Sequence, residues 1–397
     1  MSYHHKFFPS KTLFAFYCGS DHCHRPQFRE FAVEFVLDDG STAWRRHIPL
    51  ADHTELAKEV KKPNFRTLHV GAIHDADCNF AKLGSAKPQS RELVFDLDLQ
   101  DYSWLAVERD DQAANDRHMP IVFASAAILE AALRLVFGFE KFLRVYSGRR
   151  GCHLYVLDNR ARALTDEARA AICAQLSAPV DKFDPRLLFC NVVRTNPNLR
   201  DHSTKCAINA AIDCAAAILL ADRAGVETFV TKLFDWPQKT EYADLHDQLK
   251  REMLLALQEK VGGAALAAVR AATAEQPQIY RTRLSDVLLS LVWPRLDTAA
   301  SKLGHCVKAP FSLHAKTGRV ALPIPSWDSA VPIVNGNEMR TCADASPAFK
   351  VGLACMQPFA KLKRQRPTTT TTTATTTTAF TAMDTEALPD VEDLGRH

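Results

Sequence analysis

The first third of the chain alternates hydrophobic and polar residues at the two-residue period of β-strands. Two such runs within residues 29–50 flank the turn sequence Asp38-Asp39-Gly40, which predicts a β-hairpin. Residues 67–73, "TLHVGAI", predict a third strand, and residues 91–102, "RELVFDLDLQDY", predict a fourth. The N-terminal part is therefore expected to be rich in β-structure.

The apolar spacing then becomes helical in residues 120–139, and this helix is predicted to end near Gly138. Residues 142–158, "FLRVYSGRRGCHLYVLD", return to a strand, a turn and a strand. Alanine- and leucine-rich helical segments follow from about residue 160 to residue 293, and residues 308–324, "KAPFSLHAKTGRVALPI", predict another hairpin.

These elements predict an α/β fold, more narrowly an α+β core with a mixed sheet and an inserted helical subdomain. We expect the core in residues 1–160 and 291–360, and the helical subdomain in residues 161–290. Residues 361–397 are expected to form a disordered basic, threonine-rich and acidic tail, because this low-complexity composition cannot build a core. Its first residues, "KLKRQR", suit nuclear import, nucleic-acid binding or simple solvation.

Composition narrows the class of protein. The chain has 397 residues, of which 47% are hydrophobic and 24% charged, and a formal net charge of +3, so any nucleic-acid surface must be a local cluster. No uninterrupted apolar run reaches the length of about 18 residues that a membrane span needs, and "MSYHHKFF" lacks the apolar centre of a signal peptide. Eleven scattered cysteines favour a reducing compartment, the cytosol or the nucleus.

Asp96 and Asp98 share one face of the fourth strand, opposite the apolar odd-numbered positions. Aspartate is depleted in strands, so the pair needs a reason. One reason is a half-exposed strand whose polar face meets water. The other is metal binding, since two carboxylates side by side on one face can hold one divalent ion, or two ions about 4 Å apart.

"YSGRRGCH", residues 146–153, places two glycines around two arginines in a tight turn. Such a turn lets backbone N–H groups and both guanidinium groups point at one anion. A hairpin with an exposed basic turn is the alternative interpretation. Residues 293–324 add Asp297, Lys308 and His314, which taken singly suit a helix cap, a surface charge and a packed strand residue. Together, three carboxylates and several cations are what nucleotidyl transfer needs.

The motifs "ELVFDLDLQDY", "VYSGRRGCHLYV" and "PRLD…KAPFSLHAKTGR" resemble, in order, the signatures of the catalytic (small) subunit of eukaryotic-type DNA primase, in the archaeo-eukaryotic primase superfamily. "FREFAVEF", "WRRH" and "VGAIHD" lie upstream in the same order as in that family. The resemblance implies metal binding by Asp96, Asp98 and Asp297. It implies nucleotide binding by Ser147, Arg149, Arg150, His153, Lys308 and His314, with Arg45 near the active centre.

The resemblance also implies an activity and partners. The family makes short RNA primers on single-stranded DNA by two-metal nucleotidyl transfer, as a DNA-directed RNA polymerase of the primase type, with two Mg²⁺ or Mn²⁺ ions. The expected partners are nucleoside triphosphates, the large iron–sulfur primase subunit in a heterodimer and the DNA polymerase alpha complex, all in the nucleus.

This sequence departs from the family pattern at two places. Members usually have a zinc-binding cysteine cluster after the aspartate strand, but residues 103–127 contain no cysteine, and "YCGSDHCH", residues 17–24, lacks the spacing of a closed site, so no structural zinc is expected. His69 stands where the family tends to have an acidic residue. A repair-type primase-polymerase, an inactive structural subunit and a metal-dependent phosphodiesterase are the alternatives, and the three aspartates favour the active enzyme.

Overall fold

The structure is a computed structural model that describes residues 3–19, 25–102, 104–105, 111–177, 212–213, 215–234, 243–327, 330–339 and 347–360. The predicted tail and its basic run lie outside the described residues, as do residues 20–24 of "YCGSDHCH". Among the described residues, Cys78, Cys152, Cys173, Cys306 and Cys355 are not in disulfide bonds.

The first sheet has the strand order β2-β1-β3-β4, and β8 pairs with the same β3. Its strands are β1 (Arg29–Val36), β2 (Thr42–Ile48), β3 (Phe65–His74), β4 (Pro88–Ser90) and β8 (Val307–Lys308). The predicted hairpin is confirmed: Val36 pairs with Thr42, and Gly40 takes the positive φ of +80° that the turn requires. Helices α1 (Tyr3–Lys6), α2 (Ser10–Cys18) and α3 (His53–Val60) contribute to the apolar core on this sheet.

The second sheet has the order β5-β7-β6-β9. Its strands are β5 (Leu93–Asp98), β7 (Gly151–Val156), β6 (Phe142–Tyr146) and β9 (Leu322–Ile324). The α+β class is confirmed, but strand pairs among the described residues are antiparallel in both sheets, where we expected a mixed sheet. The reason is that neighbours such as β6 and β7 are joined by tight turns, whereas parallel pairs need long crossover connections.

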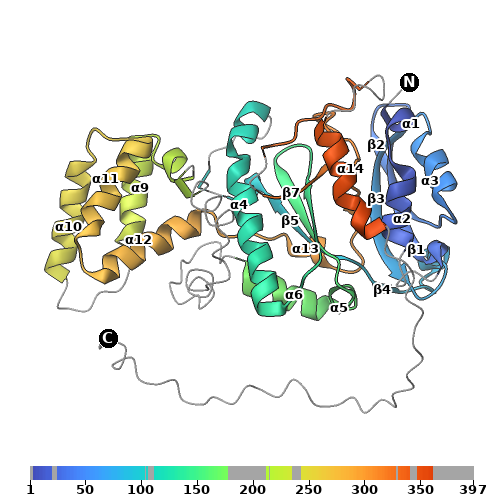
Figure 1. Cartoon of the computed structure of the whole chain (residues 1–397), viewed down its shortest axis with the longest axis horizontal. Coiled ribbons are helices and arrows are strands. Elements are labelled where there is room, and N and C mark those ends of the chain that lie inside the picture. The colour runs from blue at the N-terminus through green and yellow to red at the C-terminus, as the bar shows by residue number, and fades with distance from the viewer. Residues whose placement is uncertain are drawn as a thin grey trace, which may run out of the picture. The chain divides into compact units, whose positions relative to one another are not determined.

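Helix α4 (Gln112–Phe137) packs against β5 and β7 (Figure 1). It ends where predicted, with Gly138 in the left-handed conformation at φ +62°, but it begins eight residues before Pro120, capped by the Asp111 side chain. Although no uninterrupted apolar run was found, α4 is long and apolar enough by composition to cross a membrane. Because 72% of its apolar window is buried inside the protein, it has the character of a core helix.

The two faces of β5 face two different cores. Leu93, Phe95 and Leu97 pack in the core shared with α4, whereas Val94 packs in the core of the first sheet. Helix α14 (Pro347–Ala360) contributes to that second core and contacts both α2 and β9 (Figure 1). The Val94 face is therefore buried at the start of the strand and becomes partly open only at its end.

Residues 308–324 form the predicted hairpin, but its two ends continue into different sheets. Their first residue belongs to β8 in the first sheet and their last residues form β9 in the second. Between them, the Phe311 N–H donates to the Ala321 carbonyl oxygen and the His314 N–H to that of Arg319, on either side of the bridge between Leu313 and Val320. The segment thus connects the sheets. Strand periodicity alone cannot reveal this, because it does not specify the partner of a strand.

The remaining helices follow β7 and precede β8. They are α5 (Asn159–Arg162), α6 (Asp166–Leu176), α9 (Arg223–Leu233), α10 (Ala243–Ala256), α11 (Gly262–Ala274), α12 (Gln278–Leu291) and α13 (Thr298–Ser301). Helices α9 to α12 contact one another (Figure 1). Their buried apolar residues belong to the same hydrophobic cluster as those of α4. The separate helical subdomain at residues 161–290 stays a prediction.

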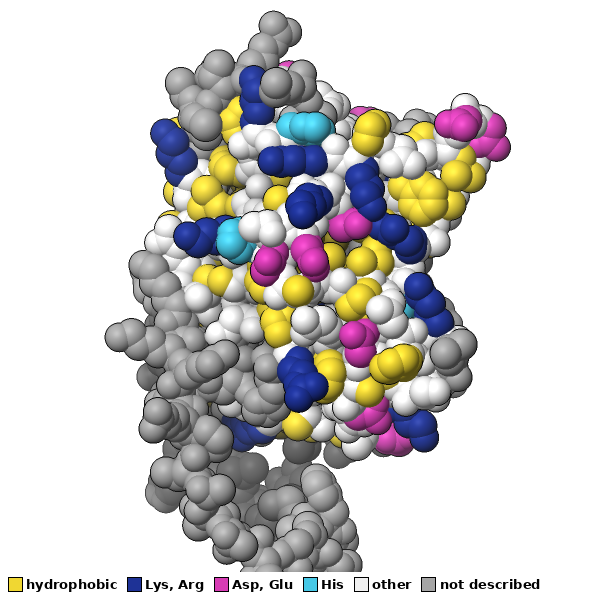
Figure 2. Space-filling view, turned by 90° about the vertical axis from the view of Figure 1, so that its right-hand side faces the viewer, with side chains coloured by type: hydrophobic (Ala, Val, Ile, Leu, Met, Phe, Trp, Pro, Cys, Tyr) yellow, Lys and Arg dark blue, Asp and Glu magenta, His cyan; other side chains and the backbone are white. Residues whose placement is uncertain are grey.

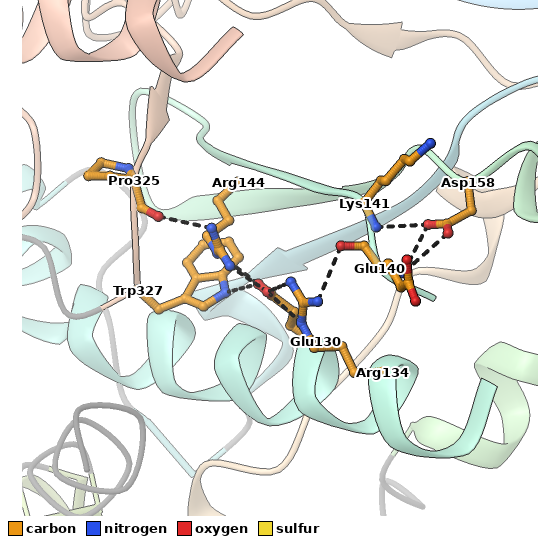
Figure 3. Close-up of polar contacts among 8 residues, drawn as sticks. All are labelled: Glu130, Arg134, Glu140, Lys141, Arg144, Asp158, Pro325 and Trp327. Carbon is orange, nitrogen blue, oxygen red and sulfur yellow. Dashed lines mark hydrogen bonds and ion pairs between the residues drawn. The ribbon is translucent and has the colours of Figure 1, made fainter. Parts of the chain in front are cut away.

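A buried carboxylate fastens α4 to the second sheet (Figure 3). Glu130 is 4% exposed and accepts hydrogen bonds from Arg134 at 2.9 Å, from Arg144 of β6 at 2.7 Å and from the Trp327 indole at 2.9 Å. Arg144 also donates to the Pro325 carbonyl oxygen at 2.9 Å, so the segment after β9 is held by the same cluster.

Candidate active site

The end of β5 carries the two aspartates side by side. Asp96 pairs with His153 of β7, and Asp98 pairs with Gly151. The Asp96 side chain is 39% exposed and that of Asp98 33%, whereas the alternate positions of the strand are fully buried. The alternation predicted from the sequence is therefore confirmed, and both carboxylates are accessible to small ligands.

Asp297 joins the pair from a distant part of the sequence. Its side chain caps α13 by accepting a hydrogen bond from the Ala299 N–H at 2.8 Å, and α13 packs against β5. The helix-cap role considered for this residue is therefore real. Its charge still acts on the strand, because it helps to raise the pKa of Asp96.

Removal from water raises the pKa of Asp96 to about 7, and repulsion from Asp98 and Asp297 adds to the rise, while Lys308 opposes it. The pKa of Asp101 is also raised, by burial and then by Asp98 and Asp297. Concentrated negative charge without full compensation suits divalent cations, which bind hard oxygen ligands. The donor set therefore fits Mg²⁺ or Mn²⁺.

The three aspartates do not form a closed set of ligands. Among the described residues, the cluster whose ligand atoms all lie within 4.8 Å of one another is a different one, Glu30, His47 and His74. Arg150 instead donates from Nε to both oxygens of Asp98, at 2.8 and 3.0 Å. An ion bound by Asp98 would compete with this guanidinium group.

The turn between β6 and β7 brings the basic motif to the same end of the sheet. Gly148 has φ +92°, and a Cβ atom there would lie 3.0 Å from the Arg319 carbonyl oxygen and 3.1 Å from the His314 Cβ. A Cβ atom at Gly151 would lie 2.5 Å from the Leu97 carbonyl oxygen. Both glycines of "SGRRG" are thus needed for close backbone approach.

Several residues that the sequence did not single out hold this turn. Thr317 donates to the Gly148 carbonyl oxygen at 2.8 Å, and Tyr146 donates to that of Arg149 at 3.1 Å. Arg319 in turn forms a two-pronged ion pair with Asp116 of α4, at 2.7 and 3.0 Å. Asp116 and Arg319 lie 203 positions apart in the chain, so only the fold shows the pair.

Lys308 lies between the basic turn and the aspartates. Its ammonium group donates to the Ser147 carbonyl oxygen at 2.6 Å, and its pKa is lowered to about 8 by burial, against the attraction of Asp96. Burial, followed by the charge of Lys308, also lowers the pKa values of His153 and His314 to about 3. Both imidazoles are therefore neutral near pH 7. The His153 Nε2 atom lies 3.6 Å from an Asp96 oxygen.

Arg45 and His69, which the sequence also singled out, lie on strands β2 and β3 of the first sheet. Arg45 pairs with Glu59 of α3, and lines a small pocket with Glu59 and Lys62 rather than contacting the aspartates. His69 pairs with Lys308 across β3 and β8, and its ring lies 4.2 Å from that of Trp44. Neither ring nitrogen of His69 has a hydrogen-bond partner among the described residues.

Comparison with known proteins identifies the group to which this arrangement belongs. A sequence model of the family described as DNA primase small subunit matches residues 95–325. The chain belongs to this family. The match begins inside β5 and includes the basic turn and Asp297, so it covers the three motifs quoted above apart from the first residues of the aspartate strand. Primase small subunits are nucleotidyltransferases of DNA replication.

Individual proteins similar to this chain are named DNA primase small subunit. The DNA primase small subunit of Schizosaccharomyces pombe is 26% identical over 340 residues, which cover 82% of this chain and 72% of the relative. That of Saccharomyces cerevisiae is 25% identical over 380 residues, covering 90% and 88%. That of Drosophila melanogaster is 27% identical over 321 residues, covering 75% and 69%. The resemblance drawn from the motifs is thereby confirmed.

Proposed function

We propose that this primase small subunit catalyses template-directed synthesis of short RNA primers on single-stranded DNA. The supporting observation is the contact between Arg150 and Asp98, which puts the basic turn and the carboxylate pair at the same end of β5 and β7. Metal-bridging carboxylates beside a phosphate-binding turn are the two parts that nucleotidyl transfer requires.

In this proposal Asp96, Asp98 and Asp297 hold two divalent ions, Mg²⁺ or Mn²⁺. Such ions, when bound, lower the pKa of the attacking 3′-hydroxyl and stabilise charge on the departing pyrophosphate. The backbone of the turn, with Arg149, Arg150 and Lys308, holds the triphosphate of the incoming nucleotide. Arg150 then exchanges one anionic partner, Asp98, for another, a phosphate group.

The remaining predicted residues have supporting roles. Ser147 closes the turn, since its N–H donates to the Gly151 carbonyl oxygen at 2.9 Å. His153 and His314 are neutral, so we propose that they donate hydrogen bonds to phosphate oxygens without adding charge. Nucleotide binding by Arg45 stays a prediction, since its guanidinium group pairs with Glu59 of α3 in this structure.

The template is read by base pairing, so the protein needs contacts to the nucleic-acid backbone. Figure 2 shows Lys and Arg side chains spread over the face on the side of β1 and β2, with acidic and histidine side chains among them. With a net charge of only +3, affinity of the chain alone for single-stranded DNA should be weak and salt-dependent. We propose a heterodimer with the large iron–sulfur subunit, working in the nucleus with the DNA polymerase alpha complex.

The test is primer synthesis on a single-stranded thymidine template with labelled ATP, with and without the large subunit. We expect products that require Mg²⁺ or Mn²⁺, and faster initiation when the large subunit is present. A folded Asp98→Asn variant serves as the inactive control. No product from either preparation, under conditions in which the chain is folded, would exclude the catalytic role.

A further inference from the structure

A second group of metal-ligating side chains lies in the first sheet. Glu30 of β1, His47 of β2 and His74 at the end of β3 come from three neighbouring strands, and their ligand atoms lie within 4.8 Å of one another. Tetrahedral bonds of 2.0–2.1 Å place ligand atoms about 3.4 Å apart, so adjustments of about 1 Å would close a site here. Strand positions are rigid supports for such a site.

The two histidines have unused nitrogens. His74 is 5% exposed, and its Nδ1 atom has no hydrogen-bond partner among the described residues. The His47 Nδ1 atom likewise has none, although it lies 3.3 Å from a Glu30 oxygen. A buried polar atom without a partner destabilises the fold. These nitrogens are therefore available to bind a metal ion.

A cysteine lies beside Glu30, although its sulfur does not belong to the group of ligand atoms that lie within 4.8 Å of one another. A Cβ atom at Gly71 would lie 2.5 Å from a Glu30 oxygen and 2.9 Å from the Cys306 sulfur, so the glycine leaves space that these two side chains fill. Burial, and then the charge of Glu30, raises the pKa of the Cys306 thiol to about 12. The thiol is therefore protonated until a cation displaces its proton.

Glu30 is already partly neutralised. Its side chain is 1% exposed and accepts hydrogen bonds from Arg46, at 2.9 Å from Nε and 3.2 Å from Nη2. Because this ion pair stabilises the carboxylate without a metal, the first sheet does not depend on an ion to fold. The site would hold an exchangeable ion rather than a structural one.

We propose that Glu30, His47 and His74 bind one borderline divalent transition metal ion such as Zn²⁺, with Cys306 as a fourth ligand after loss of its proton. Imidazole and thiolate ligands favour Zn²⁺ over Mg²⁺, which prefers oxygen ligands and octahedral geometry. This ligand set is distinct from the three aspartates, and none of its members comes from the cysteine-free segment after β5.

The experiment measures metal binding to the full chain rather than primer synthesis. An Asp96→Asn/Asp98→Asn background removes most binding at the candidate active site. The chain is stripped with a chelator, and Zn²⁺ is then titrated by calorimetry, with Co²⁺ as a spectroscopic probe of tetrahedral geometry. We expect one ion per chain, a rise in melting temperature of a few degrees at saturation, and a visible Co²⁺ spectrum.

His47→Gln and His74→Gln should each weaken Zn²⁺ binding at least a hundredfold. His47 is partly exposed, with 24% of its side chain accessible, so its variant should fold even if that of buried His74 does not. His4→Gln is the matched control, because His4 is also buried and has an unpartnered Nε2 but lies outside the cluster. Cys306→Ser should remove the sulfur-to-cobalt charge-transfer band.

Three results would overturn the proposal. These are no Zn²⁺ binding at micromolar concentrations by the folded chain, binding that His47→Gln leaves unchanged, and equal loss of binding in His4→Gln. Unchanged binding in Cys306→Ser would overturn only the fourth ligand. Primer synthesis is not a readout, so failure here leaves the proposed catalytic function standing.

Discussion

Glu130 and Asp96 are two carboxylates at the second sheet, and their surroundings differ. Glu130 is buried and meets two guanidinium groups and an indole N–H (Figure 3). Asp96 is partly open and has other carboxylates nearby that Lys308 only partly offsets, and its pKa is raised to about 7. Other side chains of the fold compensate the charge of Glu130, whereas the charge of Asp96 is left for a bound cation to compensate.

This difference separates a structural charge from a candidate functional one. A buried ion pair with all its partners costs little to keep, whereas removing one partner leaves an uncompensated charge. A cluster of like charges destabilises the fold, so its presence indicates a site where a ligand binds. The comparison therefore predicts that mutating Asp96 harms activity, and that mutating Glu130 harms stability.

The largest effect should follow from Asp96→Asn or Asp98→Asn. Loss of one positioned electrostatic group commonly slows catalysis about a hundredfold to a thousandfold, and loss of a metal ligand should cost at least as much. Primer synthesis measured with saturating Mg²⁺ should fall accordingly, while circular dichroism shows a folded protein. A folded Asp98→Asn variant that retains near wild-type activity would contradict the metal-site assignment.

Asp297→Asn provides a matched test of the third aspartate. Asparagine caps helices about as well as aspartate, so α13 should keep its N-terminal hydrogen bond to Ala299. We expect stability unchanged within about 0.5 kcal/mol, and a loss of activity similar to that of Asp98→Asn. If activity survives, Asp297 acts only as a helix cap.

Glu130→Gln should have the opposite outcome. The change leaves Arg134 and Arg144 without their carboxylate, but both guanidinium groups are partly exposed and can gain water, so the cost should be about 1–3 kcal/mol rather than the full penalty of a buried charge. Urea unfolding measures this cost. Activity per folded molecule should stay within twofold of wild type, and a large loss of activity would undo the contrast with Asp96.

The sequence predicted local features better than partners. The period of β5 located both aspartates on one face, and Gly138 marked the end of α4, because these signals lie within a few residues. The start of α4 was wrong, since the apolar spacing indicated a helix only from residue 120, whereas the helix begins at Gln112 and is capped by Asp111. The hairpin of residues 308–324 was predicted, but the pairing of its ends with β3 in one sheet and β6 in the other was not, because strand pairing depends on residues far away in the chain.

The same limit applies to the candidate site. The residue types in the three motifs indicated metal and triphosphate chemistry, and their family resemblance supplied roles. The ion pair between Asp116 and Arg319, and the cluster of Glu30 with His47 and His74, have no spacing signature. Each joins separate elements, so only the folded chain brings their side chains together.

A smaller effect is expected from Arg319→Lys. Lysine keeps the charge but cannot reproduce the two-pronged pair with Asp116, so the basic turn should be held less firmly. We expect the KM for nucleoside triphosphates to rise about tenfold, the equivalent of about 1.4 kcal/mol, with kcat changed less. Asp116→Asn should give a similar shift. Equal losses in kcat and unchanged KM would instead indicate a role in the chemical step.

The smallest effect concerns pH. Since Asp96 must lose a proton to bind an ion and its pKa is raised to about 7, lowering the pH from 8 to 6.5 should weaken Mn²⁺ binding about fourfold. The folded chain holds this proton between pH 4 and 7 when the unfolded chain does not, so the contribution of Asp96 to stability falls as the pH rises through that range. Mn²⁺ titration of the wild-type chain measures the first dependence. Melting of the metal-free protein measures the second, which should be smaller in Asp96→Asn because the titrating carboxyl group is gone. A dependence on pH that is the same in wild type and in Asp96→Asn would assign the proton to another group, and would remove the contrast with Glu130.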